Sequence, residues 1–118
     1  MQTIAEIRAA CAEFAGTAET FPFDATTLVF KVGGKMFALT GIDADPVSLS
    51  LKCDPARAER LRAEYPEKIL PGYHLDKRHW NTLVLDGSLP NELVRELLVH
   101  SRDLVVRGLR KAEREALT

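Results

Sequence analysis

Residues 26–40, with the sequence TTLVFKVGGKMFALT, decide the fold of this chain. The runs 26–32 and 35–40 are rich in β-branched and aromatic residues, a composition that favours strands. Gly33 and Gly34 lie between them and supply the positive backbone φ angles that a tight hairpin turn requires. Strands joined by so short a turn pair antiparallel. The stretch therefore predicts an antiparallel β-hairpin.

A third strand follows this hairpin. Residues 41–46 (GIDADP) have the composition of a turn. After them, apolar and polar residues alternate with the period of two that is typical of a strand with one buried and one wet face. The apolar positions are Val47, Leu49, Leu51 and Cys53, and the polar positions are Ser48, Ser50 and Lys52.

Helices are predicted on both sides of these strands. Thr3 and Glu6 match a capping box at the start of a helix over residues 4–15, and Gly16 is a suitable stop. Residues 17–24 are expected to form a loop. Asp54 and the proline after it predict the start of a second helix, which runs to about residue 65.

The remaining third contains weaker strand signals and one long helix. A short strand is expected over residues 68–70 and another over residues 82–85, the latter ending at an Asp-Gly turn. From Pro90 onward apolar residues recur at helical spacing, and the tail from Arg110 is highly charged. The predicted order is α-β-β-β-α-β-β-α. It indicates an α+β fold: one domain over residues 1–118, a two-layer sandwich with helices on one face of an antiparallel sheet.

Composition limits the class of protein. The 118 residues include 16 basic and 17 acidic side chains, for a formal net charge of −1 and a pI near 6.3. This balance excludes a generic polycation that coats nucleic acid. No apolar run approaches the roughly 20 residues that span a bilayer, and no signal peptide is evident at the N-terminus. With only two cysteines, the sequence predicts a reduced, cytoplasmic protein and no membrane partner.

Enzyme and metal motifs are missing from the sequence. It has no G-x-S-x-G, P-loop, H-E-x-x-H or G-x-G-x-x-G pattern. Adjacent residues on a helix do not face each other, so His100 and Ser101 do not form a nucleophile–base pair. His74 and His79 flank Asp76 without the tight spacing of metal ligands. We therefore expect a non-enzymatic protein without catalytic residues, metal or cofactor.

Two basic elements contrast with the rest of the chain. Residues 68–80 carry three basic side chains against one acidic one, whereas residues 1–27 carry one against four. Lys31 and Lys35 bracket the hairpin turn, and Lys77 and Arg78 lie in the second element. The charged surface of the last helix, with Arg107 and Arg110, is expected to be separate from both.

The segment from Gly72 to Trp80 is also unusual in composition. It contains the single Trp, one of the two Tyr and two of the three His residues, His74 and His79. Loops that concentrate such side chains often bind ligands or partners. Trp80 has two interpretations: it anchors the loop to the core, or it stacks on a ligand.

Four stretches carry a resemblance to a known family. Residues 30–38 (FKVGGKMFA), 50–55 (SLKCDP), 71–82 (PGYHLDKRHWNT) and 85–90 (LDGSLP), with Ser101, resemble the MmcQ/YjbR family of small bacterial proteins. The resemblance spans nearly the whole chain. It implies the CyaY-like, or secretion-chaperone-like, two-layer fold.

The resemblance also implies a function. Members of the family are commonly labelled DNA-binding because the fold resembles a double-wing motif. On this interpretation Lys31, Lys35, Lys77 and Arg78 contact the phosphates of duplex DNA. His74, His79 and Trp80, which match the family's recurring motif, then shape a ligand or partner loop. The alternative is a protein-interaction or small-ligand-binding module without nucleic-acid binding.

Overall fold

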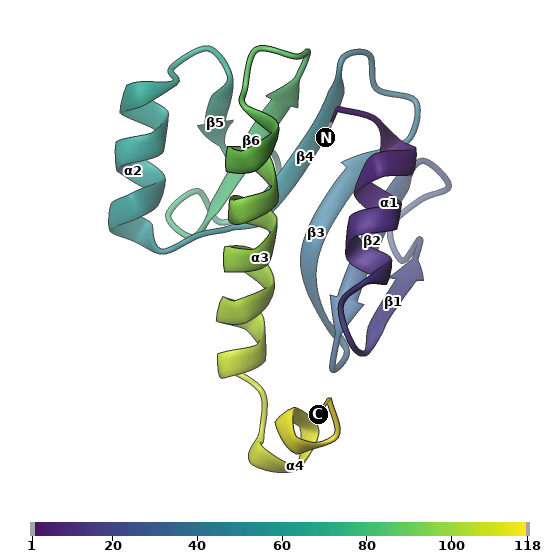
Figure 1. The fold of residues 1–118 in the computed structure, drawn as a ribbon. Coiled ribbons are helices and arrows are strands. Elements are labelled where there is room, and N and C mark those ends of the chain that lie inside the picture. The colour runs from purple at the N-terminus through teal and green to yellow at the C-terminus, as the bar shows by residue number, and fades with distance from the viewer. Residues whose placement is uncertain (1, 118) are drawn as a thin grey trace.

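The computed structural model describes residues 2–117 and consists of a six-stranded sheet with helices on one face (Figure 1). In chain order the elements are α1 (Ile4–Ala12), β1 (Thr17–Thr20), β2 (Thr27–Val32), β3 (Lys35–Gly41), β4 (Val47–Lys52), α2 (Pro55–Glu64), β5 (Ile69–Pro71), β6 (Trp80–Leu85), α3 (Asn91–Arg107) and α4 (Lys111–Glu115). None of the helices within residues 2–117 is both long enough and apolar enough to span a bilayer.

The strands lie in the order β1-β2-β3-β4-β6-β5, and every neighbouring pair is antiparallel. Helices α1, α2 and α3 cover the same face of this sheet in Figure 1. The α+β, two-layer architecture predicted from the sequence is therefore confirmed.

Two elements were not predicted. β1 occupies the first four residues of the expected loop over residues 17–24, and α4 lies in the charged tail. β1 is an edge strand whose residues Thr17–Thr20 are exposed or half-buried, so it carries no alternating apolar pattern. It forms because the backbone of β2 offers it a hydrogen-bonding partner. The predicted order of elements was wrong at these two places.

The element boundaries also shift by a few residues. α1 ends at Ala12 rather than at residue 15. β6 begins at Trp80, two residues before the predicted start. The predicted caps are present: the amide of Glu6 donates to the Thr3 hydroxyl at 3.1 Å, and the amide of Arg57 donates to the Asp54 carboxylate at 3.2 Å.

The main hydrophobic core lies between the sheet and the helices. Its largest fully buried side chains are Phe30 and Phe37, whose ring centroids lie 6.4 Å apart. Cys11 and Cys53 are buried free thiols in the same cluster. Burial raises the pKa of Cys11 to about 12, so this thiol stays protonated and unreactive near neutral pH.

A β-bulge in β3 is joined to α3 by one buried hydroxyl. Phe30 pairs with Ala38 and Lys31 with Met36, so Phe37 is an extra residue without a partner on β2. The Ser101 hydroxyl donates to the carbonyl oxygen of Phe37 at 2.6 Å.

The same hydroxyl also connects α3 to the neighbouring strand. It accepts from the amide of Lys52, the last residue of β4, at 2.9 Å. Ser101 is fully buried. Ser101, which was predicted not to pair with His100 as nucleophile and base, thus satisfies backbone groups of two strands.

A second, smaller apolar cluster lies on the open face of the sheet, opposite the helices. It consists of Val29, Leu39 and Trp80, with Met36 and Leu75 packed against it. Leu75 comes from the loop before β6. The loop therefore folds back over the open face.

Candidate functional site

The β2–β3 hairpin packs against the segment that follows α3. Gly33 has a φ of +58°, and a Cβ atom at this position would lie 2.7 Å from the Leu109 side chain. The Lys35 ammonium lies 3.5 Å from the carbonyl oxygen of Gly108, at the end of α3. Arg107 and Arg110, which the sequence analysis placed on a separate surface, are thus beside the hairpin, and that expectation was wrong.

The loop over residues 72–79 is held by its own polar side chains. The Lys77 ammonium donates to the carbonyl oxygen of Gly72 at 3.0 Å, which closes the loop. The Asp76 carboxylate contacts the His79 ring at 2.7 Å and accepts from the amide of Arg78 at 2.9 Å. These bonds hold the pKa of Asp76 below its usual value, with the His79 contact as the largest cause. Lys77 and His79 therefore have structural contacts within the loop.

Arg78 differs from its neighbours in this loop. Its side chain forms no ion pair with any of residues 2–117. The Lys31 side chain likewise lacks an ion pair among the described residues. Both cations are therefore available to a ligand.

The register of the sheet brings these basic elements to one end of the molecule. Lys31 and Lys35 lie beside the hairpin turn, where β2 ends and β3 begins. On the next strand along, Lys52 pairs with Trp80, so the loop before β6 reaches the same end. α3 also ends here, next to the hairpin.

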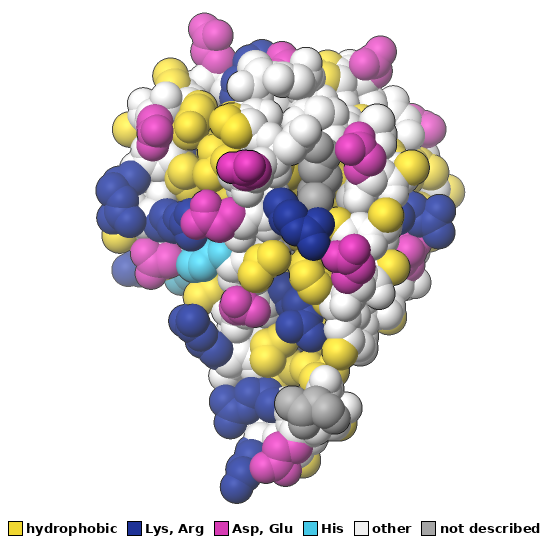
Figure 2. Space-filling view, viewed as in Figure 1, with side chains coloured by type: hydrophobic (Ala, Val, Ile, Leu, Met, Phe, Trp, Pro, Cys, Tyr) yellow, Lys and Arg dark blue, Asp and Glu magenta, His cyan; other side chains and the backbone are white. Residues whose placement is uncertain are grey.

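We call this region the basic end. Its cations are Lys31, Lys35, Lys52, Lys77, Arg78, Arg107, Arg110, Lys111 and Arg114. Among residues 2–117, two of them have carboxylate partners, since Arg110 pairs with Glu113 at 3.0 Å and Lys111 lies 3.9 Å from Glu115. Asp76 also lies in the loop that carries Lys77 and Arg78. Figure 2 shows Lys and Arg side chains gathered over the lower part of the helix side, whereas Asp and Glu predominate above. Positive and negative side chains are thus concentrated in different parts of this surface, although the formal net charge of the protein is only −1.

The aromatic residues of the loop have different roles. Trp80 is only 8% exposed and packs in the open-face cluster, which favours the core-anchor interpretation. Tyr73 is 73% exposed. His74 has a φ of +57°, in the left-handed region, and its ring centroid lies 4.0 Å from that of Tyr73. His74 and Tyr73 are therefore exposed at the surface, whereas Trp80 is buried.

A groove of about 460 Å³ runs along the open face beside this loop. Its floor includes Ser50 and Thr82, whose hydroxyl oxygens are 2.8 Å apart. Apolar side chains, among them Leu39, Leu70 and Tyr73, form much of the lining. The size falls in the range of small-molecule pockets. The alternation of polar residues in β4 predicted a wet face but not a groove.

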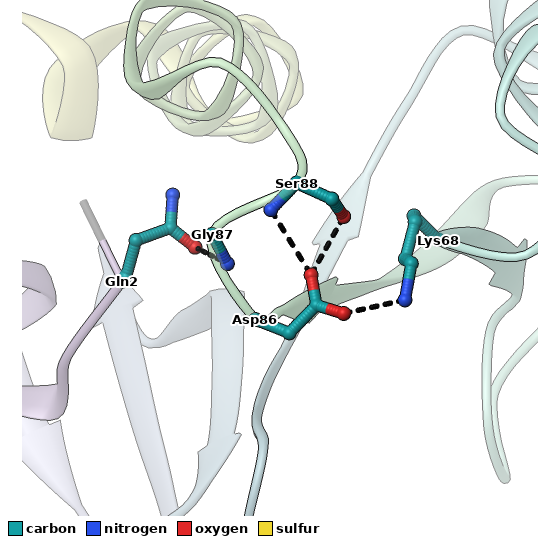
Figure 3. A network of polar contacts seen from close by, with 5 residues as sticks. All are labelled: Gln2, Lys68, Asp86, Gly87 and Ser88. Atoms are coloured by element: carbon teal, nitrogen blue, oxygen red, sulfur yellow. Dashed lines mark hydrogen bonds and ion pairs between the residues drawn. The ribbon is translucent and has the colours of Figure 1, made fainter.

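The LDGSLP stretch forms a structural turn. The Asp86 carboxylate accepts from the amide and hydroxyl of Ser88 and pairs with the Lys68 ammonium (Figure 3). The Gln2 side chain accepts from the amide of Gly87 at 3.1 Å. The Lys68 hydrogen bond is the main reason that the pKa of Asp86 lies well below its usual value. The network ties the turn before α3 to β5 and to the N-terminus.

The third histidine, His100, lies on α3. His100 accepts from the amide of Asp54 at 3.3 Å, and desolvation lowers its pKa. Among residues 2–117 no three His, Cys, Asp or Glu side chains are grouped as metal ligands.

The two-layer fold and these motifs define a class of small α+β proteins, and comparison with known proteins places the chain within it. A family model described as YjbR matches residues 12–104. The chain therefore belongs to the YjbR family, as the resemblance in its sequence indicated. It is 32% identical to protein YjbR of Escherichia coli K12 over 115 residues, which are 98% of this chain and 97% of the relative. It is 36% identical to protein YbdF of Escherichia coli O157:H7 over 95 residues, 80% of this chain and 77% of that protein.

Two crystal structures have the same fold. Protein DR2400 of Deinococcus radiodurans superposes with a TM-score of 0.95 at 53% identity, covering 99% of this chain and 88% of that one. A protein from Pseudomonas syringae superposes with a TM-score of 0.69 at 27% identity, covering 88% of this chain and 98% of that one.

Proposed function

We propose that this member of the YjbR family is a non-enzymatic DNA-binding protein whose basic end contacts the phosphates of a duplex. The observation that carries the proposal is the segregation of charge. Lys31, Lys35 and Arg78, predicted as phosphate contacts from the sequence, lie at one end of the molecule together with Arg107. Such a concentration of positive charge attracts a polyanion even when the protein as a whole is nearly neutral.

The arrangement modifies the double-wing interpretation. The hairpin is not a free wing, because Gly33 and Lys35 pack against the segment after α3. The hairpin and the C-terminal segment thus act as one basic element, and the loop bearing Arg78 is the second. Lys77 contributes its charge from a fixed position, since its ammonium donates to Gly72.

Salt dependence provides the test. Each neutralised phosphate contributes about 0.9 to the slope of log affinity against log salt. Contacts from Lys31, Lys35, Arg78 and Arg107 therefore predict a slope of roughly −3.6 for a random-sequence duplex. Fluorescence anisotropy with a labelled duplex measures this slope directly.

Substitution of the basic end provides the matched comparison. Replacing Lys31, Lys35 and Arg78 together by Ala should flatten the slope by roughly 2–3. The control replaces three cations on the helices, Arg8, Arg60 and Arg95, and should leave the slope unchanged. Equal losses from both triple variants, or no duplex binding by the wild type at low salt, would contradict the proposal.

The groove on the open face favours a second candidate function, a small-ligand or protein-interaction module. Its apolar lining and its volume of about 460 Å³ are the supporting observation. Binding there would bury apolar surface, so the affinity would change little with salt. The salt titration therefore separates the two functions.

A further inference from the structure

A slot on the open face, between the segment before β2 and the loop before β6, has a distinct chemistry. It has a volume of about 380 Å³ and lies between Phe23 and Asp24 on one side and the loop residues Tyr73, His74 and Leu75 on the other. Thr27 and Leu39 line both this slot and the open-face groove, together with Tyr73 and Leu75. The slot is thus continuous with the groove.

The slot contains a carboxylate without a cationic partner. Asp24 accepts from the amides of Thr26 and Thr27 at 2.9 and 2.7 Å through one oxygen. Its other oxygen accepts only from the Thr27 hydroxyl, at 3.2 Å. Hydrogen bonds from the amides of Thr26 and Thr27 lower the pKa of Asp24, so the group is ionised at neutral pH. Within residues 2–117 it forms no ion pair.

Two aromatic side chains flank this carboxylate with most of their surface in water. Phe23 is 64% exposed and Tyr73 is 73% exposed. Neither ring contributes to the core in this position. Aromatic faces attract organic cations, and the attraction strengthens when a carboxylate lies nearby.

Two further carboxylates lie in a turn that is joined to the Asp24 loop. Asp43 and Asp45 lie in the turn between β3 and β4. This turn is joined to the Asp24 loop by the hydrogen bond from the Ile42 amide to the Thr26 carbonyl oxygen at 2.8 Å. The basic end lies at the far end of β2, beyond Lys31. The carboxylates at and beside the slot favour a cationic occupant over an anionic one.

We propose that the slot binds the head group of a small amphipathic organic cation, an alkylammonium whose apolar tail lies in the open-face groove. The head group lies between Phe23 and Tyr73 and against Asp24. The tail crosses Leu39 toward Leu70, above the floor of the groove. The slot shares the loop over residues 72–79 with the basic end, but the proposed binding of the cation does not depend on DNA binding.

The test is a titration of the full chain with hexyltrimethylammonium, followed by the NMR shifts of backbone amides. Saturable shifts are expected at residues 23–27 and 73–75. Hexanol has the same tail without the charge and should bind at least fivefold more weakly, and hexanoate more weakly still. Hexanoate binding as tightly as the cation would overturn the proposal.

Variants locate the binding. Asp24→Asn keeps an oxygen that accepts from the amides, and should weaken the cation about fivefold, the effect of one exposed charge at about 4 Å. Tyr73→Ala should weaken it about two- to fivefold, whereas Tyr73→Phe should bind as the wild type does. Phe21→Ala is the matched control, because Phe21 is 47% exposed but lines a different hollow, beside α1. Unchanged affinity in Asp24→Asn, or an equal loss in Phe21→Ala, would show that the slot is not the site.

Discussion

Replacing Ser101 by Ala should destabilise the protein by about 2–5 kcal/mol. The hydroxyl satisfies two backbone groups, the amide of Lys52 at 2.9 Å and the carbonyl oxygen of Phe37 at 2.6 Å. The site is fully buried. A buried backbone group left without a partner costs about 1–3 kcal/mol. Two such groups give the expected loss in the free energy of unfolding. Small shifts of the strands that give these groups new partners reduce the loss.

The assay is urea unfolding followed by circular dichroism, with Ser50→Ala as the matched control. The Ser50 hydroxyl is also largely buried, but it contacts only the Thr82 hydroxyl, whose oxygen also accepts from the amide of Tyr73 at 3.0 Å and keeps that partner in the variant. We expect the control to lose about 1 kcal/mol or less. If both variants unfold at the same urea concentration, the Ser101 hydroxyl does not pin α3 to the strands, and the reasoning is refuted.

Three further predictions concern stability. Trp80→Ala should lower the free energy of unfolding by about 3–5 kcal/mol, because it deletes a buried aromatic side chain. An unchanged thermal midpoint would favour the interpretation that Trp80 stacks on a ligand. Gly33→Ala should lower the melting temperature, because the residue has positive φ and its new methyl group would meet Leu109; a melt equal to that of the wild type would contradict the packed hairpin. The folded state depresses the pKa of Asp86 through its bond to Lys68, so the stability from this group is present above its unfolded pKa and is lost as the pH falls through the acid range. Urea midpoints between pH 5 and pH 2 should therefore fall less in Asp86→Asn than in the wild type, and parallel curves would exclude that contribution.

The sequence predicted the parts of the fold that local chemistry determines. The hairpin around Gly33 and Gly34, the cap at Asp54 and the alternation in β4 each depend on a few neighbouring residues, and each is present. β1 was missed because its pairing depends on β2 rather than on its own apolar pattern. Its four polar and small residues are compatible with either a loop or an edge strand.

The candidate site was harder to predict because it depends on long-range packing. The sequence identified Lys31, Lys35 and Arg78 as basic, but not that the end of α3, with Arg107, packs beside the hairpin. The slot at Phe23 exists only because the loop of Tyr73 folds across the open face. The pattern of the sequence contains no signal for that fold-back. In the structure, Leu75 of this loop packs against the cluster that contains Trp80, whose burial the sequence left open.

The measurement that tests the central claim most directly is amide shift mapping of the protein with a random-sequence duplex at low salt. DNA binding through the basic end predicts perturbed amides at residues 31–36, 76–79 and 107–114, and shifts that collapse as salt is added. Amides at residues 23–27 and 43–45, the segments that contain Asp24, Asp43 and Asp45, should keep their shifts. Perturbations concentrated on these two segments, or none at any salt concentration, would contradict the proposed function.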